Sequence, residues 1–139
     1  MSWVVDTCIL LDILEDDPEF GNKSAKCLKA YLQEGLFVCP VTFIEMAPAF
    51  AGNYTAQLEF FRLCGIADNI EFSRVDSEKA YHAWDRYIKA KRKRKSEAFP
   101  KRPVADIMIG AFACRFDGLI TRNGKDFQPW FPGLKIIHP

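Results

Sequence analysis

Short apolar runs alternate along the chain with longer segments in which apolar residues recur at helical spacing. Buried strands are expected at Trp3–Val5, Leu36–Pro40, Ile70–Val75, Gly118–Thr121 and Leu134–His138. Segments with helical spacing separate the first four of these runs. Strands that alternate with helices predict a parallel sheet with helices on its faces. The chain is therefore expected to adopt an α/β fold.

Caps and breakers indicate where the helices begin and end. Asn22 and Ser77 are the expected N-caps of a second helix and of a long amphipathic helix, and Thr42 is a candidate cap for a third helix. Pro48 should make that third helix short or kinked. Pro103 suits the first turn of a very apolar, buried helix. The highly charged stretch between the last two helices is expected to be a loop.

Length and composition indicate one globular domain, over residues 1–139. Of these 139 residues, 49% are hydrophobic and 27% are charged. No apolar run approaches the roughly 20 residues of a membrane span, and the N-terminus lacks the features of a signal peptide. We therefore expect a soluble, cytoplasmic protein with no membrane partner. The five scattered cysteines have no metal-binding spacing and are expected to be reduced thiols.

Charge is distributed unevenly along the chain. The formal net charge is only +1, but the segment from Lys89 to Arg102 holds eight basic residues and one acid, a net charge of +7. The remaining residues hold 11 bases and 17 acids, a net charge of −6. An acidic body with one strongly basic segment is typical of proteins that attract phosphate groups, although a solvated segment without a partner has the same composition.

Acidic side chains stand where strands and buried helices would ordinarily carry apolar ones. Asp6 follows the first strand, Glu45 lies in the third helix, Asp106 lies near the start of the buried helix, and Asn123 and Asp126 follow the fourth strand. Each alone has an ordinary explanation, such as the preference of a helix N-terminus for negative charge. In a parallel sheet, however, groups that follow the strands gather at one edge. Several carboxylates there would repel one another unless a cation bridged them, and their hard oxygen atoms suit Mg²⁺ or Mn²⁺.

Four segments resemble, in order, the motif blocks of PIN domains. They read VVDTCILLDIL from Val4, VTFIEMA from Val41, PVADIMIGAFA from Pro103 and LITRNGKDF from Leu119. The resemblance covers essentially the whole chain and is greatest to the VapC-type toxins of toxin–antitoxin pairs. It implies a PIN-like three-layer sandwich, in which a short, mostly parallel central sheet is flanked by helices.

The resemblance also implies which acids would bind a metal ion. Asp6, Glu45 and Asp106 match the three acidic metal-binding positions of the family. The fourth position is Asp126 or Asn123, and Asp126 is the stronger candidate because it carries a charge. Together these residues are expected to bind Mg²⁺ or Mn²⁺ and to form the catalytic site.

Three further residues of the motifs are expected to lie beside the acids. Thr7 and Thr121 match hydroxyl positions near the site in the family. Cys8 departs from the serine or asparagine that is common at its position. Because a thiol is a weak hydrogen-bond donor, a supporting hydrogen bond from this position is in doubt. Asp12, a second aspartate in the first motif, is expected at the surface or paired with a base.

These implications predict a metal-dependent endoribonuclease, in which a bound ion activates water for attack on an RNA phosphodiester. The expected RNA-binding residues are Arg92, Lys93, Arg94, Lys95 and, nearer the acids, Arg122. VapC-type toxins usually form homodimers and are silenced by a cognate antitoxin. The expected partners are therefore RNA, an antitoxin protein and a second copy of the chain.

Other functions fit part of the same pattern. A phosphotransferase of the haloacid-dehalogenase kind also places an aspartate after its first strand, but it needs a second aspartate where this chain has Cys8. A housekeeping RNA-processing nuclease would use the same acids. A catalytically inert module that binds RNA or a protein partner would keep the fold alone, and it would bind no divalent ion at millimolar concentrations.

Overall fold

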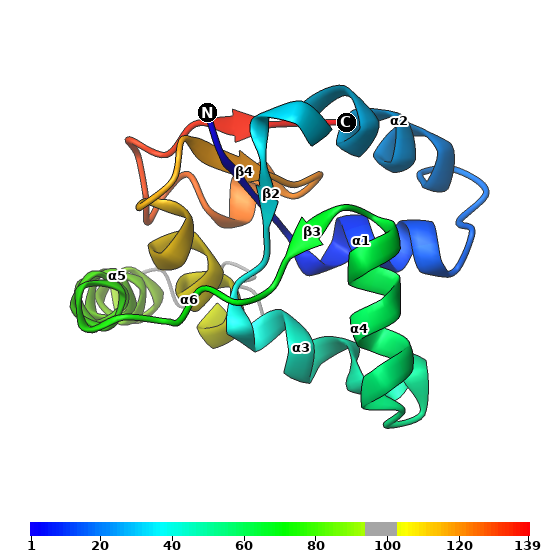
Figure 1. Ribbon diagram of the computed structural model, residues 1–139. Coiled ribbons are helices and arrows are strands. Elements are labelled where there is room, and N and C mark those ends of the chain that lie inside the picture. The colour runs from blue at the N-terminus through cyan, green and yellow to red at the C-terminus, as the bar shows by residue number, and fades with distance from the viewer. Residues whose placement is uncertain (94–102) are drawn as a thin grey trace.

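The computed structural model describes residues 1–93 and 103–139 of the chain, and Figure 1 shows how the elements are arranged. Its strands are β1 (Trp3–Val5), β2 (Leu36–Phe37), β3 (Ile66–Ala67), β4 (Gly118–Ile120) and β5 (Ile136–Ile137). Its α-helices are α1 (Thr7–Leu14), α2 (Gly21–Tyr31), α3 (Pro40–Met46), α4 (Tyr54–Leu63), α5 (Arg74–Lys93) and α6 (Pro103–Ala113). Short 3₁₀ helices are η1 (Leu32–Glu34), η2 (Ala47–Phe50) and η3 (Gly124–Asp126).

The five strands form one parallel sheet in the order β3-β2-β1-β4-β5. Successive strands add to one side of β1 as far as β3, and the chain then crosses to the other side of β1 to form β4 and β5. The strand order therefore reverses between β1 and β4. In sheets of this kind, ligands bind at the carboxyl edge where the order reverses. The predicted α/β sandwich is confirmed, and its mostly parallel sheet is in fact entirely parallel.

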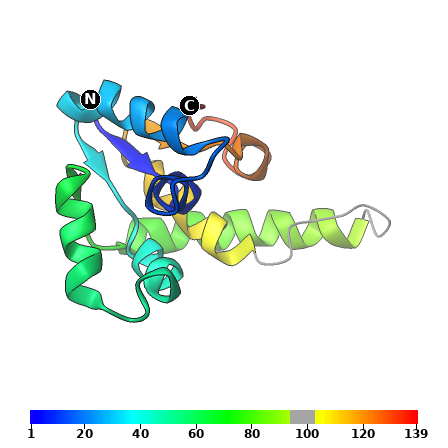
Figure 2. The same ribbon diagram turned by 90° about the vertical axis from the view of Figure 1, so that its right-hand side faces the viewer.

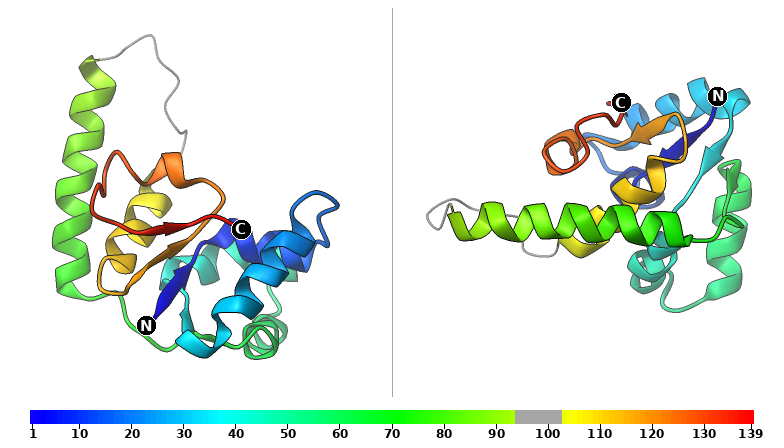
Figure 3. Two further views of the ribbon diagram at one scale, coloured as in Figure 1. Left: turned by 90° about the horizontal axis from the view of Figure 1, so that it is seen from above. Right: turned by 90° about the vertical axis from the view of Figure 1, so that its left-hand side faces the viewer.

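Alternate residues of the central strands pack into two different cores. Trp3 and Val5 join the core that contains residues of α1, α2 and α4, whereas Val4 joins the core on the side of α6. Likewise, Ile120 and Leu119 of β4 face opposite sides of the sheet. This alternation follows from the two-residue period of a strand. It leaves both faces of the sheet covered by helices, with α5 packed outside α6 (Figure 3).

The expected strand at Ile70–Val75 was wrong, because the edge strand β3 lies earlier, at Ile66–Ala67. The segment after β3 leads instead into α5, which begins at Arg74 and not at the predicted cap Ser77. The Asp76 side chain accepts from the Ser73 backbone amide at 2.8 Å, and the Ser73 hydroxyl lies 3.3 Å from the Asp76 amide. This reciprocal pair is a capping box, which outweighs the strand-like alternation of the preceding residues.

The other expected helix ends were partly right. Helix α2 begins at Gly21, and Asn22 lies inside it. Helix α3 begins at Pro40, so Thr42 is not its cap. The helix ends before Pro48 and is short, as expected. Helix α5 ends at Lys93, and the rest of the basic segment, which is expected to be a loop, lies outside the described residues. All five cysteines are free thiols, as expected.

Helix α5 is the longest element among the described residues, and it extends past the rest of the domain (Figure 2). Its last turn contains Lys91, Arg92 and Lys93. Its inner face packs on α6 through Ala83. Among residues 1–93 and 103–139, we find no helix long and apolar enough to cross a membrane.

Candidate active site

Residues from two neighbouring strands meet at the point where the strand order reverses. Val5 of β1 pairs with Ile120 of β4, so the residues that follow them, Asp6 and Thr121, lie side by side. The Asp6 amide donates to the Ile120 carbonyl at 3.0 Å, which continues the ladder one step beyond the strands. Asp6 thus lies at the carboxyl edge of the sheet, and it is only 4% exposed.

Three donors surround the Asp6 carboxylate. Asp6 is the N-cap of α1, and its Oδ1 accepts from the Thr7 amide at 2.8 Å. Its Oδ2 accepts from the Thr121 hydroxyl at 2.7 Å and from the Cys8 thiol at 3.3 Å. The supporting bond from Cys8 that the sequence put in doubt is therefore present, at the longer distance of a sulfur donor. Burial nevertheless raises the pKa of Asp6 above its ordinary value, and the nearby Glu45 raises it further.

A pair of threonines positions Glu45. The Thr7 hydroxyl donates to Glu45 Oε1 at 2.7 Å and lies 3.0 Å from the hydroxyl of Thr42. Because Thr7 has one hydroxyl proton and gives it to Glu45, Thr42 must donate to Thr7. Thr42 was considered only as a helix cap, but it is completely buried and three residues before Glu45, on the same face of α3. That spacing is the signal by which the sequence could have identified it.

Asp106 and Asp126 complete the acidic group. Asp106 lies in the first turn of α6 and Asp126 in η3, and both are partly buried. Burial raises the pKa of Asp106 from 3.8 to about 7, and the negative charges of Asp6, Asp126 and Glu45 add to this increase. The four predicted acids therefore share one electrostatic field. Asn123 lies at the start of η3, and its amide donates to the Thr121 hydroxyl at 3.0 Å.

The acidic group differs from the other buried acids in having no basic partner among the described residues. Asp12 and Asp76 are as buried as Asp6, and each forms an ion pair with an arginine, Arg122 and Arg115 respectively. No ion pair or attractive charge acts on Asp6 or Asp106 within residues 1–93 and 103–139. A buried carboxylate without a countercharge is costly. The group thus has the electrostatics of a cation site.

The donor set suits a hard divalent cation, because all its side-chain donors are oxygen atoms from carboxylates. The side chains are not closed around one point, however. In the part of the chain that the structure describes, no three His, Cys, Asp or Glu side chains stand close enough together to form a ready-made metal cluster. Both oxygens of Asp6 and one of Glu45 are engaged by protein donors. Asp6 Oδ1 and both oxygens of Glu45 still have lone pairs that these bonds do not use, so an ion could bind while the bonds remain.

Arg122, one of the predicted RNA-binding residues, forms an ion pair with Asp12, and its side chain is 29% exposed. Its Nε and one terminal nitrogen donate to the two Asp12 oxygens at 2.9 and 3.1 Å, and its guanidinium lies 4.4 Å from the centre of the Phe20 ring. The Ser24 hydroxyl also donates to Asp12, at 3.2 Å. Asp12 is thus buried and paired with a base, Arg122, which is the second of the two placements expected for it. The pair fixes the segment after β4 that carries Thr121.

The remaining predicted RNA-binding residues lie at and beyond the end of α5. Arg92 and Lys93 are exposed in its last turn. Arg94 and Lys95 lie outside the described residues. The exposed bases at this end of α5 are the part of the predicted basic segment that can be placed relative to the domain.

Replacing Thr121 by valine should remove the shortest hydrogen bond to Asp6 with little change of shape. Thr121 is completely buried, so the carboxylate would keep only the thiol on Oδ2. We expect the free energy of unfolding to fall by about 1.5–3 kcal/mol, as for other hydrogen bonds to charged groups. Urea unfolding of this variant would measure the loss. Thr55→Val, at an exposed position of α4, is the matched control, and an equal effect of both changes would contradict the assigned bond.

Comparison with known proteins agrees with this geometry. The family model of the PIN domain matches residues 3–128, and the chain therefore belongs to the PIN-domain family. PIN domains are generally nucleases that use divalent metal ions.

A solved structure extends the likeness over nearly the full length. A chain of VapBC2 from Rickettsia felis, crystallised with a DNA fragment from the promoter of that pair, is similar with a TM-score of 0.67. The likeness covers 99% of this chain and 98% of the other at 15% sequence identity, which establishes a shared fold. No curated protein sequence matches the chain.

Proposed function

We propose that this protein is a metal-dependent endoribonuclease that acts as the VapC-type toxin of a toxin–antitoxin pair. The observation that carries the proposal is the acidic group at the reversal point of the sheet. Its four carboxylates share one field without a basic partner among the described residues, while the other deeply buried aspartates there have arginines. Membership of a family of nucleases supports the same function.

Asp6, Glu45 and Asp106 would hold one or two ions of Mg²⁺ or Mn²⁺, with Asp126 or Asn123 as the further ligand. When bound, such an ion lowers the pKa of water and stabilises charge on a phosphoryl oxygen. The donors to Asp6 fix the direction of its carboxylate, and the Thr42–Thr7 pair does the same for Glu45. These bonds would keep the acids in place when a strand of RNA approaches.

The partners of the proposed toxin follow from the same family. The RNA would contact the exposed basic side chains of Arg92 and Lys93 and, beyond the described residues, those of Arg94 and Lys95. An antitoxin protein would silence the enzyme by covering the acidic group, and the active form would be a homodimer. The similar Rickettsia felis chain comes from a VapBC2 structure, which supports a search for an antitoxin.

Cleavage of RNA by the purified protein tests the proposal directly. We expect an unstructured RNA to be cut in Mn²⁺ or Mg²⁺ and to remain intact in EDTA. Asp6→Asn and Asp106→Asn should each reduce the rate by at least about 100-fold, since even outer partners of metal ligands cost 10–100-fold. Asp16→Asn, at an exposed position after α1, is a control of the same chemistry. Unchanged cleavage by either site variant would contradict the proposed metal-dependent mechanism.

The inert alternative makes a different prediction for ion binding. A module that keeps the fold without the chemistry would bind no Mn²⁺ at millimolar concentrations in calorimetry. The proposed enzyme should bind Mn²⁺, and Asp106→Asn should weaken that binding. This measurement does not depend on choosing the right RNA.

A further inference from the structure

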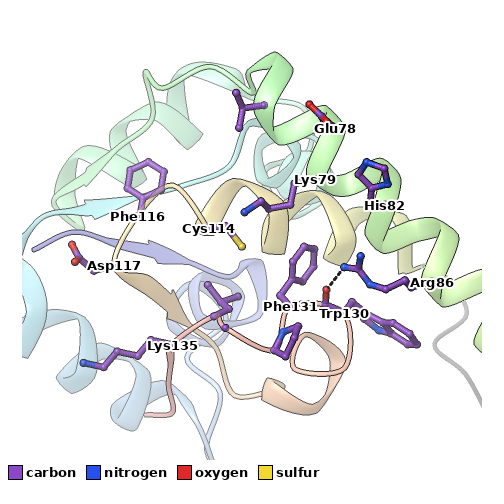
Figure 4. A pocket seen from close by; sticks show the side chains of 14 residues that line it. Glu78, Lys79, His82, Arg86, Cys114, Phe116, Asp117, Trp130, Phe131 and Lys135 are labelled. Atoms are coloured by element: carbon purple, nitrogen blue, oxygen red, sulfur yellow. Dashed lines mark hydrogen bonds between the residues drawn. The ribbon is translucent and has the colours of Figure 1, made fainter.

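A cleft lies at the other end of the sheet from the acidic group. It is a cleft of about 650 Å³ between the first half of α5 and the segment Trp130–Lys135 that leads into β5 (Figure 4). Asp117, on its wall, precedes the start of β4, whereas Thr121 at the acidic group follows the end of that strand. We call this hollow the α5 cleft. It has the volume of a typical small-ligand site.

Basic side chains of α5 line one side of the α5 cleft. Lys79, His82 and Arg86 recur at helical spacing, which places them on one face of the helix. Lys79 points toward Cys114 on the floor of the cleft (Figure 4), and no ion pair joins it to a described acid. Arg86 donates to the Trp130 carbonyl at 2.8 Å, which ties the opposite wall to the helix.

The other side of the α5 cleft is aromatic. Phe131 is packed against α6 with its ring at the cleft, and the half-buried Trp130 makes an edge contact with Tyr87, at 5.4 Å between ring centres. Phe131 is only 4% exposed, so the partly exposed ring of Trp130, which Tyr87 holds in place, is the surface that a ligand could contact. Proteins bind unpaired nucleotides with flat aromatic side chains that lie beside lysine or arginine residues.

Two acids, Asp117 and Glu78, also line the α5 cleft, and the structure shows, within the part of the chain that it describes, no ion pair between either of them and Lys79 or Arg86. Asp117 accepts from both the backbone amide and the hydroxyl of Ser2, at 2.6 and 3.3 Å. Glu78 is exposed on α5, beside the basic face. The Lys135 ammonium lies 5.2 Å from the centre of the Trp3 ring, so the positive charges that a ligand in the cleft would meet are those of Lys79 and Arg86. The cleft is therefore suited to a ligand with an aromatic ring and negative charge.

The basic face continues from the α5 cleft toward the carboxyl edge of the sheet. Lys89 and Lys93 follow Arg86 at spacings of three and four residues, on the same face of α5, and both are exposed. From Arg86 to Lys93 the helix rises about 10 Å. The same end of α5 extends past the body of the domain on the side where β1 and β4 end (Figure 3). Lys89 also forms an ion pair with the exposed Asp85, and Arg86 and Lys93 extend the positive charge of this face from the cleft toward the side of the acidic group.

We propose that the α5 cleft binds an unpaired nucleotide of the RNA substrate, at a distance from the bond that is cut. The base would stack on the ring of Trp130, and the adjoining phosphates would contact Lys79 and Arg86. The strand would then follow Lys89 and Lys93 toward the acidic group. This inference rests on the proposed ribonuclease function and adds to it a second binding point that would favour longer, single-stranded substrates.

Binding of a labelled, unstructured RNA in EDTA measures the α5 cleft without cleavage. Lys79→Gln/Arg86→Gln should weaken binding and flatten its salt dependence by about 0.7 in logarithmic slope for each phosphate that the variant no longer neutralises. Lys26→Gln/Lys29→Gln removes the same charge from exposed positions of α2 and should leave binding unchanged. Because Arg86 also anchors Trp130, the single variant Lys79→Glu provides a test that breaks no hydrogen bond among the described residues.

Two further readouts separate this inference from the proposed function. RNA that carries 4-thiouridine should crosslink, under ultraviolet light, to the peptide that contains Trp130. In Mn²⁺, the double variant should cut a short RNA as fast as the wild type and a longer RNA more slowly.

The opposing outcomes are distinct. Unchanged RNA binding in both α5 variants overturns the inference, as does a change in sedimentation without a change in binding, which would mark the cleft as a protein interface. If the wild type cuts neither RNA, the proposed function fails instead.

Discussion

Arg122→Met is expected to lower the free energy of unfolding by about 3–5 kcal/mol, the cost of leaving one charge of a buried pair without its partner. The Asp12 side chain is 4% exposed and receives both donors of the Arg122 fork. Methionine can fill much of the space of the arginine chain, but it offers nothing to the carboxylate. Only the Ser24 hydroxyl would remain as a donor to Asp12. The loss should also loosen the segment that carries Thr121.

Urea unfolding with a matched surface variant would isolate this effect. Arg62→Met breaks an ion pair with Glu59 in which both side chains are more than half exposed, and solvent screening makes the contribution of such a pair to stability small. Adding Asp12→Asn to Arg122→Met should restore part of the stability, because no buried charge then lacks a partner. If Arg122→Met and Arg62→Met had equal effects, the pair would not be the anchor described above.

Asp106→Asn is expected to stabilise the metal-free protein at alkaline pH. The folded state raises the pKa of Asp106 from 3.8 to about 7. Between these values the folded chain retains a proton that the unfolded chain has lost, so stability falls as pH rises through this window. Asparagine carries no charge to repel Asp6 and Glu45. The variant should therefore melt several degrees higher than the wild type at pH 8 in EDTA, at about 3–5 °C for each kcal/mol in a domain of this size.

Thermal unfolding as a function of pH checks both the sign and the window. At about pH 4 the two proteins should melt at similar temperatures, because Asp106 is then protonated in the folded state. Mn²⁺ should raise the melting temperature of the wild type more than that of the variant. Asp85→Asn is the control, since Asp85 is exposed and its pKa is lowered by its bond to Lys89. A wild type that is more stable at pH 8 than Asp106→Asn would contradict the shared field.

Most of the fold was predictable because local patterns and tertiary packing agree. The strands around Val4 and Leu119 are buried on both faces, so they read as continuous apolar runs. The error fell at the sheet edge. Strand β3 has two residues, whereas the segment from Ile70 alternates like a strand and serves as the approach to α5. The capping box that starts α5 depends on two side chains facing each other, which alternation does not reveal.

The acids of the candidate site were predicted together, because their positions after strands imply a common edge. Their individual surroundings were not. Whether Arg122 faces RNA or Asp12 depends on the packing of α1 against the end of β4, and the two residues are separated by 110 positions. Likewise, the sequence identifies Cys8 only as a departure from the motif, whereas in the structure its thiol donates to Asp6. Contacts between distant segments decide these roles, and a single sequence contains no direct signal of them.

The central position of β1 determines when, during synthesis of the chain, the acidic group of the proposed enzyme can form. Strand β1 is synthesised first, but one of its two edges stays unpaired until β4 has been synthesised as far as residue 120. Asp6 lacks its Thr121 donor until then, and Asp126 comes later still. Domains fold as units during translation. A chain interrupted before residue 121 would therefore lack both Thr121 and Asp126, and we expect such a fragment to be unable to assemble the complete acidic group.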